Sequence, residues 1–310
     1  MKKVIALMLA LLLCLCAAAC GQKTTSDGNS FTVGVCQLMK HPSLDSATQG
    51  FVDALTAELG KAGKTVDVQV EVAGGADYCS TVVNALVAKN VDLLMGNATD
   101  ALLACANATA SIPVIGTSVT DYDSTFGGNI PANVTGTSDA VPFDQQAQMM
   151  IDTLGLTAGD QVGVLYCSNE SNSLIQYNAV RELFLAKGLT VKAYTFSETT
   201  ELQALTTAAA EECKAIYIPS DNTVAANDAI VGMICNEKET PVYTSYGGDI
   251  CYASLSIDYY TLGQQAGIMA AQILLGEKTP TELTVATVEP AISYNTSLCE
   301  MLGIAIPEGE

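Results

Sequence analysis

The stretch VGVLYCSNESNSLIQYNAVRELFLAKG, residues 162–188, contains the unit from which the fold can be predicted. It opens with an apolar run, Val162 to Tyr166, of the length and composition of a buried β-strand. A run of small polar residues follows, and apolar residues then recur at helical spacing as far as Gly188, a typical helix end. The stretch therefore predicts a strand, a polar loop and a helix in that order.

The first half of the chain repeats this unit. The expected strand TVGVC, residues 32–36, is followed by a polar loop around His41 and by helical spacing over residues 44–63. Val33-Gly34-Val35 aligns with Val162-Gly163-Val164 at an offset of 129 residues. Two further strand-and-loop units match in the same order, residues 91–104 with 215–227 and residues 112–121 with 240–249. A near-constant register over three units indicates an internal duplication.

Repeated β-loop-α units predict an α/β fold in which each half forms a parallel sheet covered by helices. A length of 310 residues also suits two domains rather than one. Residues 130–142 are rich in Pro, Gly and Thr without helical spacing, so we expect the first crossover between the halves there. In such sheets, ligands bind beyond the carboxyl ends of the strands. We therefore expect the polar loops of both halves to face a common cleft.

The composition excludes several functions. Acidic residues outnumber basic ones by 33 to 13 and Arg181 is the only arginine, so no basic patch is available for nucleic acid. The chain has one histidine and contains none of the sequence motifs of common hydrolases or nucleotide-binding enzymes. No CxxC or Cys/His cluster points to a metal site. We expect neither enzyme activity nor a metal or other cofactor.

The first 20 residues read as an export signal. A basic start precedes an apolar run and the small residues Ala17 to Ala19, which lead to Cys20. This end resembles a bacterial lipobox, so we expect residues 1–20 to be a lipoprotein signal peptide and Cys20 to be lipidated. An ordinary secretory signal with a chance cysteine is the alternative. Residues 21–30 read as a flexible tether. Loss of two lysines would change the net charge from −20 to about −22.

Eight cysteines remain beyond Cys20, an even number that permits disulfides in an exported protein. Several lie inside apolar strands or helices, where cysteine often acts as a small buried hydrophobe. We therefore expect mostly free, buried thiols.

Five phrases together resemble the ABC-transporter substrate-binding family that includes the tryptophan-type binding lipoproteins, within the type I periplasmic binding proteins. They are GVCQLMKHPSLDSATQGFVDAL, NIPANVTGTSD, VGVLYCSNESNSLIQ, AIYIPSDNTVAAN and IDYYTLGQQAG. The resemblance implies two Rossmann-like parallel-sheet lobes joined by a three-strand hinge and closing on a small ligand. It places residues 31–139 plus 253–281 in the N-terminal lobe and residues 140–252 plus 282–310 in the C-terminal lobe.

The resemblance also implies the partners and the location. Members deliver a ligand to an ABC permease, so we expect a monomeric, lipid-anchored, extracytoplasmic protein at the cell membrane. Family members with known ligands bind aromatic or other hydrophobic amino acids. A sugar or nucleoside ligand of the same fold remains an alternative, as does a sensor lipoprotein that signals to a receptor. Asp100 stands where relatives commonly carry Pro, which adds charge near the mouth of the cleft.

Asp221 is our candidate for binding the ammonium group of an amino acid, because it follows the strand AIYI and precedes a helix. The alternative is that it only caps that helix. Arg181 lies in mid-helix, so the ligand carboxylate must rely on hydroxyls, amides and helix N-termini. Ordinary capping and turn chemistry is the alternative for each of these polar residues. The candidates at strand ends are Thr99, Ser118, Thr120, Ser168, Asn169, Ser171 and Asn172.

Four residues complete the expected site. His41 could hydrogen-bond the ligand or simply order its loop ahead of Pro42. Gln37, Tyr122 and Tyr246 are candidate walls for the side-chain pocket.

Overall fold

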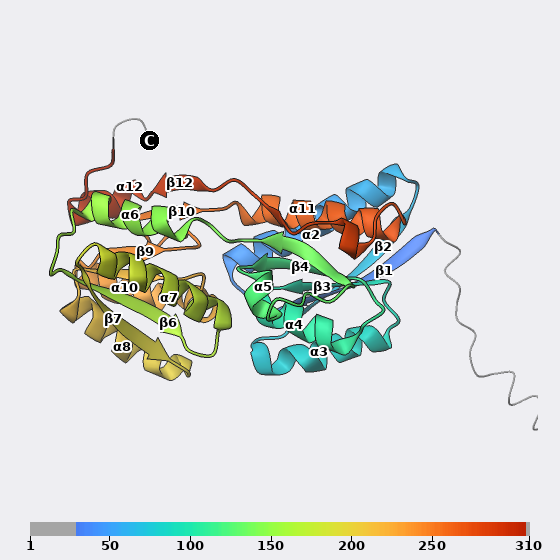
Figure 1. Ribbon diagram of the computed structural model, residues 1–310, viewed down its shortest axis with the longest axis horizontal. Helices are drawn as coiled ribbons and strands as arrows, with labels where there is room; N and C mark the ends of the chain where they lie inside the picture. The colour runs from blue at the N-terminus through green and yellow to red at the C-terminus, as the bar shows by residue number, and fades with distance from the viewer. Residues whose placement is uncertain (1–28, 308–310) are drawn as a thin grey trace, which may run out of the picture.

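The computed structural model describes residues 29–307, which form two α/β lobes side by side (Figure 1). Each lobe is built on a six-stranded sheet. The first sheet contains β1 (Ser30–Gln37), β2 (Thr65–Val72), β3 (Leu93–Asn97), β4 (Val114–Val119), β5 (Val134–Ser138) and β11 (Ala286–Thr287). The second contains β6 (Gln161–Cys167), β7 (Thr190–Phe196), β8 (Ala215–Ile218), β9 (Val242–Thr244), β10 (Ala253–Ser256) and β12 (Ala291–Tyr294).

The internal duplication is visible in the strand order. The sheets run β11-β5-β4-β3-β1-β2 and β12-β10-β9-β8-β6-β7, so each strand has a counterpart at the same place in the other lobe. Every pairing is parallel except that of β10 with β12, which is antiparallel. The prediction of two parallel-sheet lobes is confirmed.

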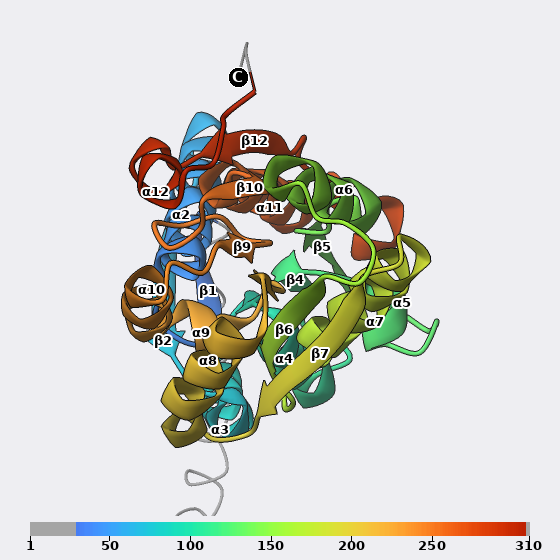
Figure 2. The ribbon, with the colours of Figure 1, turned by 90° about the vertical axis from the view of Figure 1, so that its left-hand side faces the viewer.

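Helices cover both faces of each sheet, as Figures 1 and 2 show. On the first sheet, one face carries α2 (Pro42–Lys61) and α11 (Tyr259–Leu274), and the other carries α3 (Ala76–Ala88), α4 (Thr99–Ala108) and α5 (Tyr122–Thr125). On the second, one face carries α8 (Thr199–Glu212), α9 (Asn222–Ala225) and α10 (Asp228–Glu237), and the other carries α6 (Phe143–Leu154), α7 (Ser171–Ala186) and α12 (Thr296–Leu302). A short 3₁₀ helix, η1 (Pro280–Glu282), precedes β11.

Strand β6 explains why the opening stretch is so apolar. Val162 and Val164 pack on the α7 side of the sheet, whereas Leu165 and Cys167 pack on the α8 side. Both faces of the strand are buried, so the apolar residues run without alternation, as expected for a parallel sheet between two helical layers.

The chain crosses between the described parts of the two lobes after β5, after β10 and after β11, so the three crossovers implied by the family resemblance are present.

Two boundaries drawn from the sequence differ from the strand pairing. Strand β10 lies in the second sheet although residues from 253 onward were placed in the first lobe, and β11 lies in the first sheet although residues from 282 onward were placed in the second. Strands as short as these carry no local signal for the sheet they join.

Two further features concern export and redox state. Within residues 29–307, no helix is long and apolar enough to cross a membrane. The eight cysteines from Cys36 to Cys299 are all buried and free, as the sequence favoured. Cys20 and the expected signal and tether up to residue 28 lie outside the described residues.

Candidate ligand-binding site

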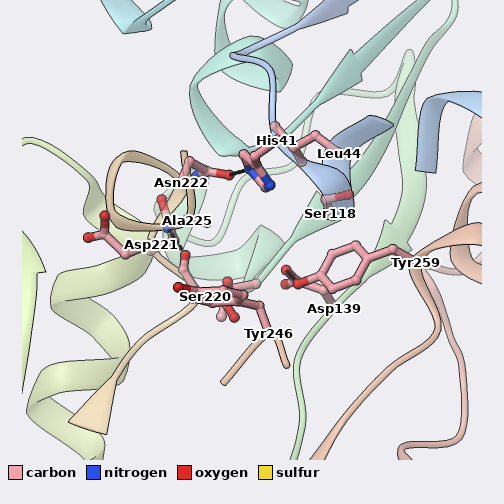
Figure 3. Close-up of a pocket in the computed structure, with 12 residues that line it drawn as sticks. His41, Leu44, Ser118, Asp139, Ser220, Asp221, Asn222, Ala225, Tyr246 and Tyr259 are labelled. Carbon is pink, nitrogen blue, oxygen red and sulfur yellow. Dashed lines mark hydrogen bonds between the residues drawn. The ribbon is translucent and has the colours of Figure 1, made fainter. Parts of the chain in front are cut away.

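A pocket lies between the lobes, where loops at the carboxyl ends of strands from both sheets meet (Figure 3). The space left between these side chains is small: about 10 Å³ is open to the centre of a water-sized sphere, roughly enough for one water molecule. The first lobe contributes His41, Leu44, Ser118, Thr120 and Asp139, the second contributes Asn172, Ser220, Asp221, Asn222, Ala225 and Tyr246, and Tyr259 follows the second crossover.

Unpaired polar atoms gather in this pocket. Among the described residues, seven buried side-chain nitrogen or oxygen atoms have no hydrogen-bond partner, and four of them belong to pocket residues. These four are His41 Nδ1, Ser118 Oγ, Asp139 Oδ1 and Tyr246 Oη. Buried polar groups in proteins are nearly always paired, so such a cluster indicates groups that a ligand satisfies.

Asp139 is the acidic group best placed for a ligand cation. It directly follows β5 at the first crossover and is 6% exposed. Its Oδ2 accepts a hydrogen bond of 3.1 Å from the Tyr259 hydroxyl, while Oδ1 has no partner. Burial raises the pKa of Asp139. The hydrogen bond from the Tyr259 hydroxyl acts in the opposite direction but does not cancel the rise. No lysine or arginine lines the described pocket, so a ligand cation would supply the missing countercharge.

The loop that holds Ser118 has an unusual backbone. Ser118 has a φ of 55°, in the left-handed region that side chains other than glycine seldom adopt. The register of β4 with β5 shifts between Gly116 and Val119, which marks a bulge at this point. The bulge turns the strand end so that Ser118 lines the pocket, and local strain of this kind is common at binding sites.

The two lobes touch across the pocket. His41 Nε2 lies 3.3 Å from Asn222 Oδ1, and Gln176 Nε2 lies 3.5 Å from Thr120 Oγ1. Each pair joins a residue of the first lobe to one of the second. The lobes are therefore in a closed arrangement.

Asp221 lines the pocket, but its carboxylate is already fully engaged within the second lobe. Oδ1 accepts from Val224 N at 2.8 Å, and Oδ2 accepts from Cys167 N at 2.7 Å and Ser173 Oγ at 2.8 Å. In Figure 3 the carboxylate points away from His41 and Tyr259. The geometry thus favours the alternative reading of Asp221 as the cap of α9.

The remaining predicted residues divide into two groups. Those that line the pocket are His41, Ser118, Thr120, Asn172 and Tyr246. Those that do not are Gln37, Thr99, Tyr122, Ser168, Asn169 and Ser171.

Most residues of the second group have local partners instead. Gln37 bonds Asp45, Met39 and Thr48 inside the first lobe, and Tyr122 donates to the Thr137 carbonyl. Ser168 and Asn169 bond the carbonyls of Phe196 and Ser197, and Ser171 is exposed at the start of α7. Thr99 is buried at the start of α4. Arg181 pairs with Glu182 at the surface and does not line the pocket.

Sequence reasoning missed Asp139 and Tyr259, although both lie in phrases that carried the family resemblance. Asp139 ends TGTSD and is followed by Ala-Val-Pro, so no helix begins at once for its carboxylate to cap. An aspartate at a strand end without a following helix N-terminus is free to face a ligand. That signal was present in the sequence and distinguishes Asp139 from Asp221.

Asp100 lies in a separate groove that is also lined by residues of both lobes. Burial, and then the carboxylate of Glu170 in the second lobe, raises the pKa of Asp100 from 3.8 to about 6. The charged form therefore destabilises this closed arrangement at neutral pH, and the penalty fades as protonation proceeds below about pH 6.

We expect Asp100→Asn to raise the melting temperature at pH 7.5 by a few degrees and at pH 4.5 by only about a third as much. The reason is that the folded carboxyl is charged at pH 7.5 and protonated at pH 4.5, while the penalty vanishes completely only below the ordinary pKa of 3.8, where the unfolded chain is protonated too. Thermal unfolding of both proteins at the two pH values measures the difference. An equal gain at both pH values would contradict the electrostatic explanation.

Two α/β lobes that close on a pocket lined from both sides define a solute-binding protein of the type I periplasmic fold. The family model described as ABC transporter substrate binding protein matches residues 32–309. The chain therefore belongs to this family of substrate-binding proteins, whose members bind solutes outside the cytoplasm and are not enzymes.

Individual relatives agree with this assignment. A tyrosine-binding protein of Clostridioides difficile (strain R20291) is 29% identical over 277 residues, which cover 86% of this chain and 79% of that protein. The crystal structure of an ABC domain in complex with L-Trp from Streptococcus pneumonia is 31% identical, with a TM-score of 0.83 over 90% of this chain and 97% of that one. A ligand-free, open substrate binding protein with adhesive properties from Clostridium difficile is 28% identical, with a TM-score of 0.67 over 90% and 97% of the two chains.

Proposed function

We propose that this protein captures a hydrophobic or aromatic amino acid for an ABC importer. The observation that carries the proposal is the buried Asp139 carboxylate, whose Oδ1 has no partner in a pocket that no lysine or arginine of the described residues lines. An α-ammonium group fits that position, because it supplies both a positive charge and hydrogen-bond donors. A sugar offers hydroxyls but no countercharge.

The carboxylate of the ligand would bind on the first-lobe side. The N-terminus of α2 has no side-chain cap, and Leu44 from its first turn lines the pocket. Free backbone N–H groups and the helix dipole favour an anion at such a place. The unpaired hydroxyl of Ser118 is a further donor. This arrangement replaces the arginine clamp that the sequence lacks.

The relatives support the class of side chain. One is named for binding tyrosine and another was solved with L-Trp, and both are about 30% identical to this chain over most of its length. The described pocket is bounded by two tyrosines, Tyr246 and Tyr259, together with Leu44 and Ala225. These side chains give an amino-acid side chain apolar surface to pack against.

Closure would couple binding to transport. Ligand contacts both lobes only when they are closed, so it stabilises that form, and the permease would recognise it. Asp139 and Tyr259 each lie beside a different crossover and are bonded to each other. A ligand bound to Asp139 therefore acts directly at the hinge. In this proposal Cys20 is lipidated and holds the protein at the outer face of the cell membrane.

The test is a ligand screen on residues 21–310 after bound ligand has been removed by partial unfolding and refolding. Melting temperatures would be measured with each of the twenty amino acids, ribose, galactose, nucleosides and short peptides. A ligand at about a thousand times its Kd stabilises by roughly 4 kcal/mol, which is several degrees here. We expect shifts with aromatic or branched amino acids. A shift with a sugar or nucleoside alone would refute the amino-acid assignment but not the fold or family.

A further inference from the structure

The hydrogen bonds around His41 fix which of its ring nitrogens carries a proton. Asn222 Nδ2 donates to Glu170 Oε2 at 2.7 Å, so the amide of Asn222 is oriented with Oδ1 toward the imidazole. His41 Nε2 lies 3.3 Å from that oxygen, which can only accept. Nε2 therefore carries the proton in this hydrogen bond, which is drawn as a dashed line in Figure 3.

The other ring nitrogen is then an acceptor. Burial lowers the pKa of His41, and its hydrogen bond to Asn222 acts in the opposite direction, so the net effect favours the neutral ring. In the neutral ring with Nε2 protonated, Nδ1 has a lone pair and no hydrogen. His41 is 6% exposed, and Nδ1 has no partner among the described residues. The pocket thus presents a second acceptor besides Asp139 Oδ1, and Figure 3 shows the two residues on opposite sides of it.

We infer that the ligand donates a hydrogen bond from its side chain to His41 Nδ1, in addition to the bond from its ammonium group to Asp139. This inference rests on the proposed function and narrows the ligand class to amino acids with a phenol or indole side chain. Phenylalanine and the aliphatic amino acids can fill the same space but leave Nδ1 unpaired. A site that hydrogen-bonds a ligand O–H or N–H rejects the analogue that lacks it more strongly than a purely apolar pocket does.

The main test compares ligands that differ only in the donor. Kd values would be measured by calorimetry for L-tyrosine against L-phenylalanine, and for L-tryptophan against its benzothiophene analogue, in which sulfur replaces the indole N–H. The comparison is made for whichever of L-tyrosine and L-tryptophan binds more tightly. We expect its analogue to bind about 10- to 100-fold more weakly, because the buried acceptor His41 Nδ1 is left unpaired. In His41→Phe, the Kd values of the parent and its analogue should differ by no more than about threefold.

A second measurement does not depend on the variant folding. His41 is the only histidine in the sequence, so ¹⁵N-histidine labelling gives a single pair of ring resonances. In the L-tyrosine or L-tryptophan complex, Nδ1 should be unprotonated and hydrogen-bonded. In the complex with the matching analogue, it should be unprotonated and unbonded, at a clearly different chemical shift.

The outcomes separate this inference from the proposed function. Equal Kd values for parent and analogue, or a proton on Nδ1 in the complex, would overturn the role of His41 and leave amino-acid capture intact. The second result would mean that His41 binds the ligand carboxylate instead. If no amino acid binds, the proposed function fails and this inference fails with it.

Discussion

Asp139→Asn is expected to weaken amino-acid binding by about 30- to 1,000-fold, the range found when one partner of a buried charge pair is removed. The amide keeps the size of the carboxylate and can still accept from Tyr259, but it carries no charge to pair with the ammonium group. The same change should raise the melting temperature of the ligand-free protein at pH 7.5. Burial raises the pKa of Asp139, so its charge costs stability until a ligand neutralises it.

If Asp139→Asn weakens ligand binding but raises the ligand-free melting temperature, Asp139 serves binding at the expense of stability. Calorimetric titration gives the Kd, and thermal unfolding without ligand gives the stability. Asp123→Asn is the matched control, since it removes the same charge from an exposed position in the same lobe and should change neither quantity much. Unchanged affinity in Asp139→Asn, or a fall in ligand-free stability, would show that the ammonium group binds elsewhere.

The duplication made the fold predictable from the sequence. The strand of residues 32–36 and the strand of residues 162–166 became β1 and β6, central strands at equivalent places in their sheets. Buried interior strands can be recognised in the sequence, because both of their faces are apolar. The short strands β10 and β11 have four and two residues, and nothing in so short a run specifies which lobe it completes. Their sheet is decided by tertiary pairing with β9 and β5.

The binding site was predictable in place but not in detail. Loops at strand ends line the candidate pocket, and His41, Ser118 and Tyr246 lie there with unpaired polar atoms. Asp221 and Asp139 both follow strands, yet one carboxylate is used by donors from β6, α7 and α9, while the other keeps an oxygen free. Which donors reach a carboxylate depends on contacts between segments far apart in the sequence, such as Cys167 with Asp221.

Helix α11 connects the candidate binding site to the hinge between the lobes. Its first residue, Tyr259, holds Asp139 from the far side of the second crossover. Asp258 caps the helix by accepting from Tyr260 N at 2.9 Å, which fixes where the helix begins. The position of Tyr259 therefore depends on how α11 seats against the first lobe. That seating is set by contact with α2.

Gly263→Ala is expected to lower the melting temperature by roughly 5–10 °C. A Cβ atom at Gly263 would overlap the carbonyl oxygen of Ala47, so the backbones of α11 and α2 approach more closely there than any side chain allows. Gly50 and Gly267 make the same kind of close approach, to Tyr260 and Phe51. Because backbone on both sides must shift, we expect a cost of about 3 kcal/mol, at the upper end for overpacking.

Gly60→Ala is the matched control, because it makes the same substitution near the end of α2 where nothing lies within 4 Å of the added carbon. It should leave the melting temperature unchanged or raise it slightly, since alanine loses less conformational entropy in a helix than glycine. Calorimetric unfolding of the three ligand-free proteins provides the comparison. A Gly263→Ala variant as stable as Gly60→Ala would mean that α11 can move away from α2 without cost. In that case the helix could not hold Tyr259, and through it Asp139, in a fixed position at the hinge.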